Sequence, residues 1–184
     1  TEIYTLSLHD ALPICISMLQ TMEGAMATID EALIRMKELA EQASTGSYST
    51  QQRNIMNNEF QQMAEEIDRI ATKTEFNSIT MLDNTTSVTL HFGSGSSIDV
   101  DGVDVTTSAL GLSSASISTA ATAQSALDLV TTAIDTKDSA RASFGYMMNR
   151  LESTTDVLNI QAENIMTAED RKSTRLNSSH RIRY

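Results

Sequence analysis

Apolar residues recur at alternating intervals of three and four over the early part of the sequence. They form a seam whose members are Leu19, Met22, Met26, Ile29, Leu33, Met36, Ala40 and Ala43. This heptad spacing is typical of a helix that packs lengthwise on another helix. The pattern stops at residues 44–47, where Gly46 is a helix breaker.

A second, shorter helix is predicted for residues 50–72. Thr50 is a suitable N-cap, because its hydroxyl can accept from the free amides of the first turn. The residues expected to face inward are Ile55, Met63, Ile67 and Ile70. Residues 74–78 then read as an ordered turn with Phe76 as its apolar anchor.

The middle of the chain changes from helical to alternating periodicity. Val88, Leu90 and Phe92 alternate with polar residues, as do Ile98 and Val100 after an intervening segment at 93–97. This alternation predicts a β-hairpin. Past Gly102, Val103 and Val105 add the signal of a short extra strand, and residues 106–122 form a connector rich in Ser, Thr and Ala.

The last part of the chain carries the longest seam. Spacings of four and three alternate through Ala123, Leu127, Val130, Ile134, Lys137, Arg141, Phe144, Met148, Leu151, Thr155, Leu158, Ala162 and Ile165. Six heptads without proline predict one helix of roughly 60 Å. Polar residues interrupt the seam at Lys137, Arg141 and Thr155, and such positions tend to set helix register at some cost in stability.

These patterns together predict a mainly α fold, an elongated antiparallel helical bundle or coiled coil with a small β-hairpin region. Seam packing is assigned to Leu33, Met36, Phe144, Leu151 and Leu158. A chemoreceptor-type signalling hairpin has a similar composition and heptads. The predicted β-hairpin argues against that alternative, because a continuous helical hairpin has no room for it.

The composition of the chain excludes some classes of binding partner. The formal net charge is −11, so nucleic acid and anionic membranes would repel the chain. No apolar run near the ~20 residues of a membrane span is evident, which predicts no membrane partner. Aromatic residues make up 4% and Trp is absent, so small and flexible side chains must fill the helical seams.

No catalytic or cofactor site is predicted. The single cysteine, Cys15, cannot form an internal disulfide, and His91 has no Cys or His at ligand spacing. Asp99, Asp101 and Asp104 do not follow the ligand order of an EF-hand, so a solvated strand edge is the better interpretation. No nucleophile and base pair can be assembled either. We therefore expect no enzyme, no metal and no cofactor.

The two ends are set apart from the rest. Back-translation of residues 1–14 and of 170–180 resembles two short-read sequencing adapters. The predicted organisation is therefore an artefactual leader at 1–14, a core domain at 15–169 and an artefactual tail at 170–184. The same reasoning predicts glycine in place of Cys15 in the organism.

Several motifs within 15–169 resemble those of bacterial flagellins. Residues 16–25 resemble the pattern D-G-I-S-x-x-Q-T-A-E-G-A, with Met22 where the family has Ala. Further resemblances are R-x-R-E-L at 35–39, E-E-I-D-R-I and T-x-F-N at 65–77, x-Q-I-G at 90–93, and R-A-x-x-G-x-x-x-N-R-L with E-N-L at 141–165. The motifs are specific in combination and cover nearly the whole core.

The resemblance implies a structural subunit of the extracellular flagellar filament, with other flagellin subunits and an export chaperone as partners. The core would comprise N-terminal helices and a turn (15–87), the β-hairpin region (88–117) and the long C-terminal helix (118–169). Further terminal helices are expected beyond both ends. A hook–filament junction protein, which shares the core pattern, is the nearest alternative.

The resemblance also implies an animal partner, the toll-like innate immune receptor that senses flagellin. The family's receptor-contact residues match Arg35, Leu39 and Glu59 here. Ile34 departs from the family's glutamine. Without the resemblance, Arg35 and Glu59 would be read as solvated surface residues.

Overall fold

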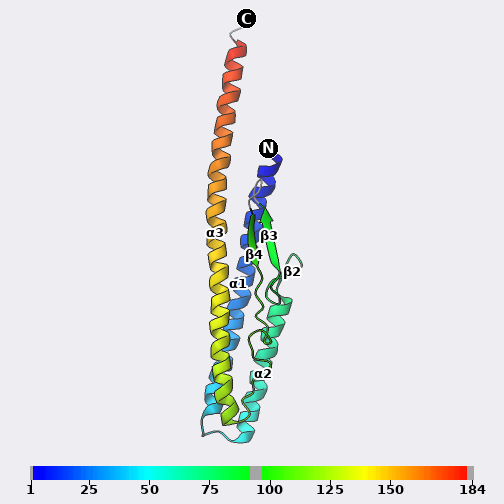
Figure 1. The fold of residues 1–184 in the computed structure, drawn as a ribbon, viewed down its shortest axis with the longest axis vertical. Helices are drawn as coiled ribbons and strands as arrows, with labels where there is room; N and C mark the ends of the chain where they lie inside the picture. Colours follow the sequence, from blue (N-terminus) through cyan, green and yellow to red (C-terminus); the bar gives the residue numbers. More distant parts are fainter. Residues whose placement is uncertain (1, 92–96, 182–184) are drawn as a thin grey trace.

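The computed structural model describes residues 2–91 and 97–181, which form an elongated bundle of three helices with two small antiparallel hairpins (Figure 1). In chain order the elements are α1 (Glu2–Ser44), α2 (Thr50–Lys73), β1 (Glu75–Phe76), β2 (Ile79–Thr80), β3 (Ser87–His91), β4 (Ser97–Asp101) and α3 (Ala120–Arg181). The predicted fold class, mainly α with a small β region, is confirmed.

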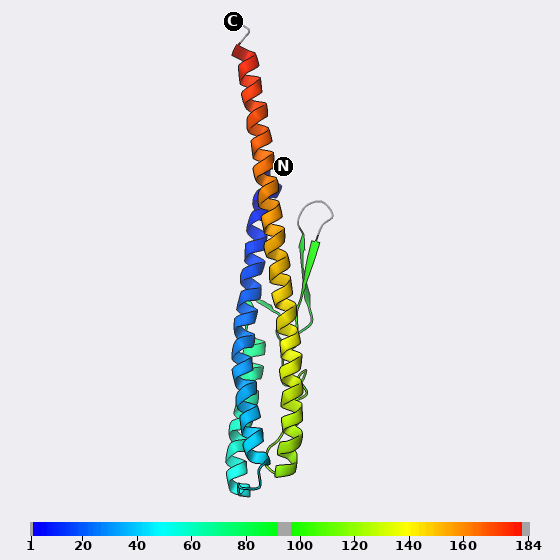
Figure 2. The same cartoon turned by 90° about the vertical axis from the view of Figure 1, so that its left-hand side faces the viewer.

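The long axis of the molecule is made by α1 and α3, which lie side by side and run in opposite directions (Figures 1 and 2). All eight residues of the first predicted seam, from Leu19 to Ala43, are fully buried. Helix α2 folds back along α1 and leaves room for the hairpins beside it (Figure 1). The heptads of α1 are therefore buried by the partner helices, as predicted.

The seam of α3 differs from the prediction in its second position. Buried side chains recur every seven residues at Ala123, Val130, Lys137, Phe144 and Leu151, as expected. The companion positions are alanines, Ala126, Ala133 and Ala140, and not the larger side chains one residue further on, Leu127, Ile134 and Arg141, which are only half-buried. Small alanines let α1 approach closely, so the larger neighbours pack at the flank of the seam.

Helix α2 begins one residue earlier than a Thr50 cap would place it. Ser49 is the N-cap: its hydroxyl accepts from the Gln52 amide, and the Gln52 side chain accepts in turn from the Ser49 amide. The prediction of Ile55 as an inward residue is wrong, because 65% of it is exposed. Phe60, Ile67 and Ile70 are buried, and heptad spacing from them leads back to Met56 rather than Ile55.

Strands β3 and β4 form the predicted hairpin, with Val88 opposite Val100 and Leu90 opposite Ile98. The predicted turn at 93–97 and the strand residue Phe92 lie mostly at positions 92–96, outside the described residues. Val103 and Val105 do not form a strand. Their amides instead donate to the carbonyls of Met81 and Leu82, which ties this extended segment to the loop after β2.

The predicted turn at 74–78 is a two-residue hairpin between β1 and β2. Both of its central residues, Asn77 and Ser78, have positive φ angles, 51° and 63°. This is the pattern of a type I′ turn, in which Asn-Gly is the favoured pair. Phe76 packs against the core, as the anchor role predicted.

Replacing Ser78 by glycine is expected to stabilise the fold by roughly 0.5 kcal/mol, because glycine carries no Cβ penalty at positive φ but loses more entropy on folding. Thermal unfolding followed by circular dichroism would show a small rise in Tm. Ser78→Ala is the matched control, which removes the hydroxyl and keeps the Cβ. An equal rise in both variants would mean that the turn conformation is not the cause.

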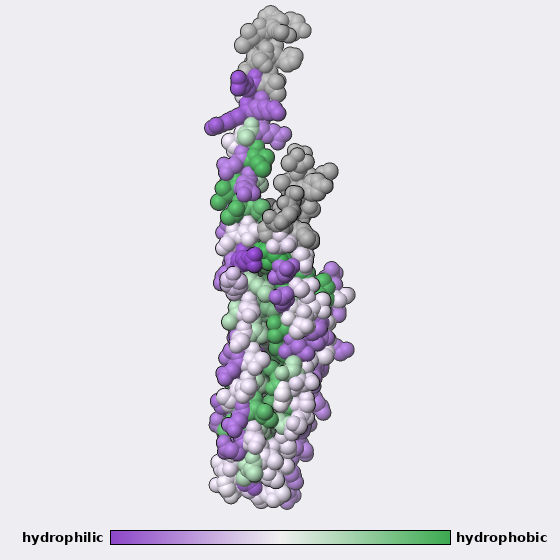
Figure 3. All heavy atoms as spheres, viewed as in Figure 1, coloured by the Kyte–Doolittle hydropathy of each residue, from purple (hydrophilic) through white to green (hydrophobic). Residues whose placement is uncertain are grey.

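Most of the distal part of α3, defined here as residues 152–175, is exposed. Four large apolar side chains stand out: Val157 (52% exposed), Ile160 (59%), Ile165 (54%) and Met166 (69%). Figure 3 shows apolar side chains on the upper part of this helix, beyond the mixed surface of the three-helix body. In the chain as described, this segment is less covered than the rest of the bundle.

Among the described residues, one stretch of α1, Leu12–Ser44, is long and apolar enough by length and composition alone to cross a bilayer. The sequence was expected to contain no such run. Its seam residues are buried against α3 and α2, while others, such as Ile14 and Ile34, are about half exposed.

Candidate functional site

The residues predicted to contact a receptor lie on α1 and α2, where the two helices run side by side. Arg35 of α1 reaches across to Glu59 of α2, with 2.7 Å from Nε and 2.6 Å from Nη2 to the carboxylate Oε1. Its Nη1 also donates to Glu38 at 2.9 Å, one turn further along α1. About two fifths of each of the Arg35 and Glu59 side chains is exposed, so this cluster is a surface feature.

The hydrogen bonds that Arg35 donates to Glu59 and then to Glu38 raise its pKa, so its guanidinium stays charged throughout the physiological range. Exposed pairs of this kind contribute little to folding. Their geometry instead fixes the arginine's direction, with its positive charge held between two carboxylates. The cluster therefore presents a fixed pattern of charge on the outer face of the α1–α2 pair.

Leu39, the third predicted contact residue, lies under this surface and not on it. It is only 1% exposed and belongs to the apolar core. Its neighbour Ile34, where the sequence departs from the family pattern, is 47% exposed beside Arg35. In this structure Arg35, Glu59 and Ile34 are thus accessible to a partner, whereas Leu39 supports them from below.

Of the five residues predicted to pack in the helix seams, four are buried and one is not. Leu33, Met36, Phe144 and Leu151 are fully buried between the helices. Leu158 is partly exposed, because it lies on distal α3.

Two ion pairs cross between α1 and α3, both involving residues that interrupt the predicted seam. Lys137 is 1% exposed, and its Nζ donates to Asp30 at 2.5 Å and to Asp138 at 2.6 Å. Four residues further along α3, Arg141 donates to Glu23 from Nη2 at 2.7 Å. Burial acts to lower the pKa of Lys137, but the hydrogen bonds to Asp138 and Asp30 outweigh it and the pKa is raised. The lysine is therefore a buried cation.

A polar face of α2 holds the connector, which sequence reasoning did not find. The Asp68 carboxylate accepts from both the amide and the hydroxyl of Thr107 at 2.8 Å. Asn57 accepts from the Ile117 amide at 2.8 Å, and Gln61 donates to the Ala115 carbonyl at 2.8 Å. The spacing of 57, 61 and 68 along one helix face was the available signal, but exposed helix faces carry the same residue types.

Among the described residues, no group of three or more His, Cys, Asp or Glu side chains is arranged to hold a metal ion. Asp104 caps its own turn by accepting from the Thr106 amide and hydroxyl, while Asp99 and Asp101 are exposed on β4. The prediction that His91 is not a metal ligand concerns a side chain that lies outside those the structure describes.

Comparison with known protein families gives one match over α1 and α2 and a second match over part of α3. The family model for the bacterial flagellin N-terminal helical region matches residues 6–87, and the model for the bacterial flagellin C-terminal helical region matches residues 127–172. Flagellin from Halalkalibacterium halodurans is 37% identical over 85% of this chain, and flagellin FlaB2 from Treponema pallidum is 30% identical over 85%. The chain spans about three fifths of those relatives' lengths, 59% and 61%.

Solved structures agree with this assignment. The crystal structure of Bacillus cereus flagellin superposes with a TM-score of 0.73 at 29% identity, covering 87% of this chain and 94% of that one. A putative flagellar hook-associated protein from Vibrio parahaemolyticus has the same fold, with a TM-score of 0.71 at 13% identity over 92% of this chain and 89% of its own. The two matched regions are the helices that pair in the fold, and the chain belongs to the bacterial flagellin family.

Proposed function

We propose that the chain is a structural subunit of an extracellular flagellar filament and has no catalytic role. The observation that carries the proposal is distal α3, where four large apolar side chains are more than half exposed. A helix that is apolar on more than one side is normally buried by neighbours. Neighbouring subunits would supply that cover.

The mechanism is assembly by lateral packing. A rigid rod, held by the α1–α3 seam, would present its distal helix to the centre of the assembly and its α1–α2 face and hairpins outward. Contacts between unlike surfaces of successive copies generate an open helical filament and not a closed ring. The family membership and the FlaB2-type relatives support this reading over a hook–filament junction role, for which only a likeness of fold speaks.

Seeded assembly tests the proposal. Fluorescently labelled chain would be mixed with monomeric Halalkalibacterium halodurans flagellin and filament seeds, and its share in pelleted filaments measured. We expect incorporation of the native chain and loss of it when Val157, Ile160, Ile165 and Met166 are all replaced by serine, with unchanged helicity. If the native chain stays in the supernatant while the relative polymerises, the proposal fails.

Two further partners follow as proposals from the family, a flagellar export chaperone and the animal toll-like receptor. For the receptor, the accessible Arg35–Glu59 pair supports Arg35 and Glu59 as contacts. Leu39 stays a predicted contact of the family, but here we expect Leu39→Ala to act mainly by loosening the core.

Arg35→Ala is expected to weaken activation of receptor-expressing reporter cells by ~10-fold or more, the scale of an interface hot spot. The matched control is Arg69→Ala, which removes another arginine from an exposed ion pair, that with Glu66. Equal potency of the native chain and the Arg35 variant would exclude Arg35 as a contact.

We also propose that residues 15–169 are the family's core domain and that 1–14 and 170–184 have another origin. The C-terminal family model ends at residue 172, so most of the tail lies outside it, whereas the N-terminal model begins at residue 6 and includes most of the leader. The proposal is therefore supported by the family models for the tail and not for the leader. Sequencing the locus from source DNA with different primers decides the point. Recovery of glycine at position 15 would support the proposal, and recovery of the present ends would reject it.

A further inference from the structure

Heptad seams repeat, so apolar packing alone does not define how two helices align. The buried seam of α1 presents an apolar side chain at each three- or four-residue step from Leu19 to Ala43, and α3 repeats every seven residues from Ala123 to Leu151. Sliding one helix by seven residues, about 10 Å, would again place apolar side chains against apolar side chains. Something else must distinguish the native alignment.

We propose that Lys137 and Arg141 of α3, paired with Asp30 and Glu23 of α1, form a register lock that selects this alignment. This inference concerns the folded chain itself and goes beyond the proposed filament role. The proposal rests on where the two cations lie relative to the seam. Lys137 occupies the centre of the seam at 1% exposure, while Arg141 lies at its flank. The two carboxylates that meet them are seven residues apart on α1.

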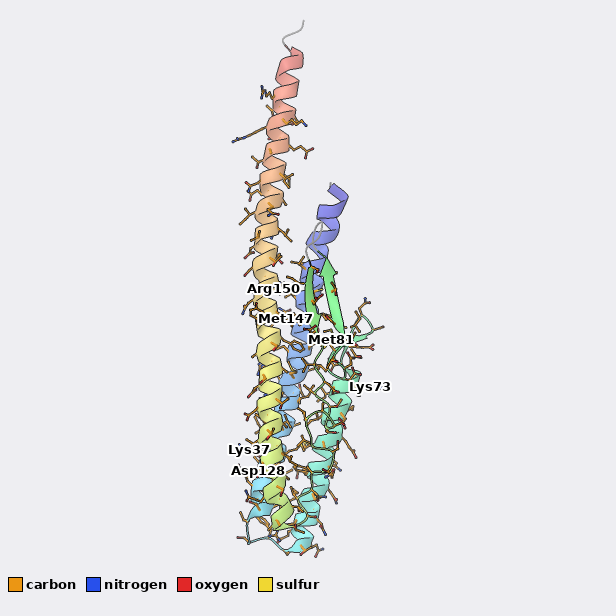
Figure 4. All side chains as sticks on the ribbon, in the orientation of Figure 1. Lys37, Lys73, Met81, Asp128, Met147 and Arg150 are labelled. Atoms are coloured by element: carbon orange, nitrogen blue, oxygen red, sulfur yellow. The ribbon has the colours of Figure 1, made fainter. Side chains whose placement is uncertain are left out.

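Each slipped alignment leaves one cation without a carboxylate from α1, although Lys137 would keep Asp138, its neighbour on α3. Moved one heptad in one direction, Lys137 would come level with Lys37, a like charge. Lys37 now lies lower in the bundle, at the level of Asp128 (Figure 4). Moved in the other direction, Lys137 would meet Glu23 and Arg141 would come level with the apolar Ile16. Of these three alignments, only the observed one gives both cations a carboxylate from α1.

The energetic argument rests on burial. A buried cation that loses one of its two carboxylates, or meets a like charge, is strongly unfavourable, whereas a fully paired one adds little net stability over an apolar residue. The lock therefore acts by penalising wrong alignments more than by stabilising the right one. This matches the role of single polar residues in coiled-coil seams, which fix alignment at some cost in stability.

Spin-label distances test the lock in the full chain. Labels would be placed on the exposed positions Thr28 of α1 and Ser139 of α3, each changed to cysteine in a Cys15→Ser background. The native chain should give one distance. Replacing Lys137 and Arg141 together by methionine keeps the seam apolar and should produce a second distance, shifted by the one-heptad slide. We expect the slipped share to rise by at least about tenfold.

Charge exchange separates a lock from mere packing. Asp30→Lys alone should introduce the second distance, and adding Lys137→Glu should restore a single one. Lys73→Met, which removes an exposed lysine of α2, should change nothing. A double methionine variant that keeps the single native distance would overturn the proposal, as would an exchange variant that stays in two alignments. If the double methionine variant keeps the native distance, the hydrogen bonds between the connector and α2 would be the better explanation for how α1 and α3 align.

Discussion

Replacing Phe144 by alanine is expected to lower the free energy of unfolding by about 3–5 kcal/mol, the range for truncating a buried phenylalanine. Phe144 is fully buried in the α3 seam, one heptad from both Lys137 and Leu151. The flanking α3 positions around it are alanines or half-buried side chains. Ala140 is too small to fill the space, whereas the flexible, half-buried Met147 and Met148 can fill part of it, which places the loss toward the lower end of that range.

Urea unfolding followed by circular dichroism at 222 nm measures the effect. Tyr146→Ala is the matched control, because Tyr146 is an aromatic residue two positions away but is 67% exposed. We expect its change to stay within ~0.5 kcal/mol, as for other surface substitutions. Similar losses for the two variants would mean that the seam near Phe144 is not packed as described.

Every residue predicted for the α1 seam is buried, whereas in α3 only one of the two repeating seam positions was predicted correctly. Spacing identifies a stripe, but the choice between Ala126 and Leu127 depends on how closely the partner helix approaches. That distance is a property of both helices together. Hydrophobicity favoured the leucine, whereas the close approach of α1 selected the alanine. The same competition explains Ile55, a strongly apolar residue one position away from the actual seam.

The surface cluster shows what sequence reasoning can supply and where it stops. The likeness to flagellins pointed to Arg35, Leu39 and Glu59, and the structure pairs Arg35 with Glu59 across two helices. It could not indicate that Leu39 is buried, since a leucine at a heptad-adjacent position fits either face. The connector contacts of Asn57, Gln61 and Asp68 were not predictable, because their partners are backbone groups of an irregular segment.

Gly102 is expected to tolerate no side chain, and Gly102→Ala should cost about 2–3 kcal/mol, the upper part of the range for overpacking. The residue follows β4 and passes directly over the loop after β2. A Cβ there would lie 2.7 Å from the Asn84 carbonyl oxygen and 2.9 Å from that of Thr86. Both atoms belong to the backbone, so neither can rotate away as a flexible side chain would.

The loop itself resists displacement. Asn84 is held by hydrogen bonds from its amide to Thr80 and to Asp83, and the Gly102 amide donates to Thr86. Moving the loop would also disturb the buried Met81 and Leu82, whose carbonyls accept from Val103 and Val105. A methyl group at 102 would therefore strain the hairpin region as a unit, while the α1–α3 seam stays intact.

Gly46→Ala is the matched control, because nothing lies within 4 Å of a Cβ at that position. Urea unfolding should show a clear loss for Gly102→Ala and a change within ~0.5 kcal/mol for Gly46→Ala. Hydrogen exchange should localise the loss, with faster exchange of the Val103 and Val105 amides and unchanged exchange in the middle of α1. Uniformly faster exchange along α1 would instead mean that the hairpin region and the helical seam unfold as one cooperative unit.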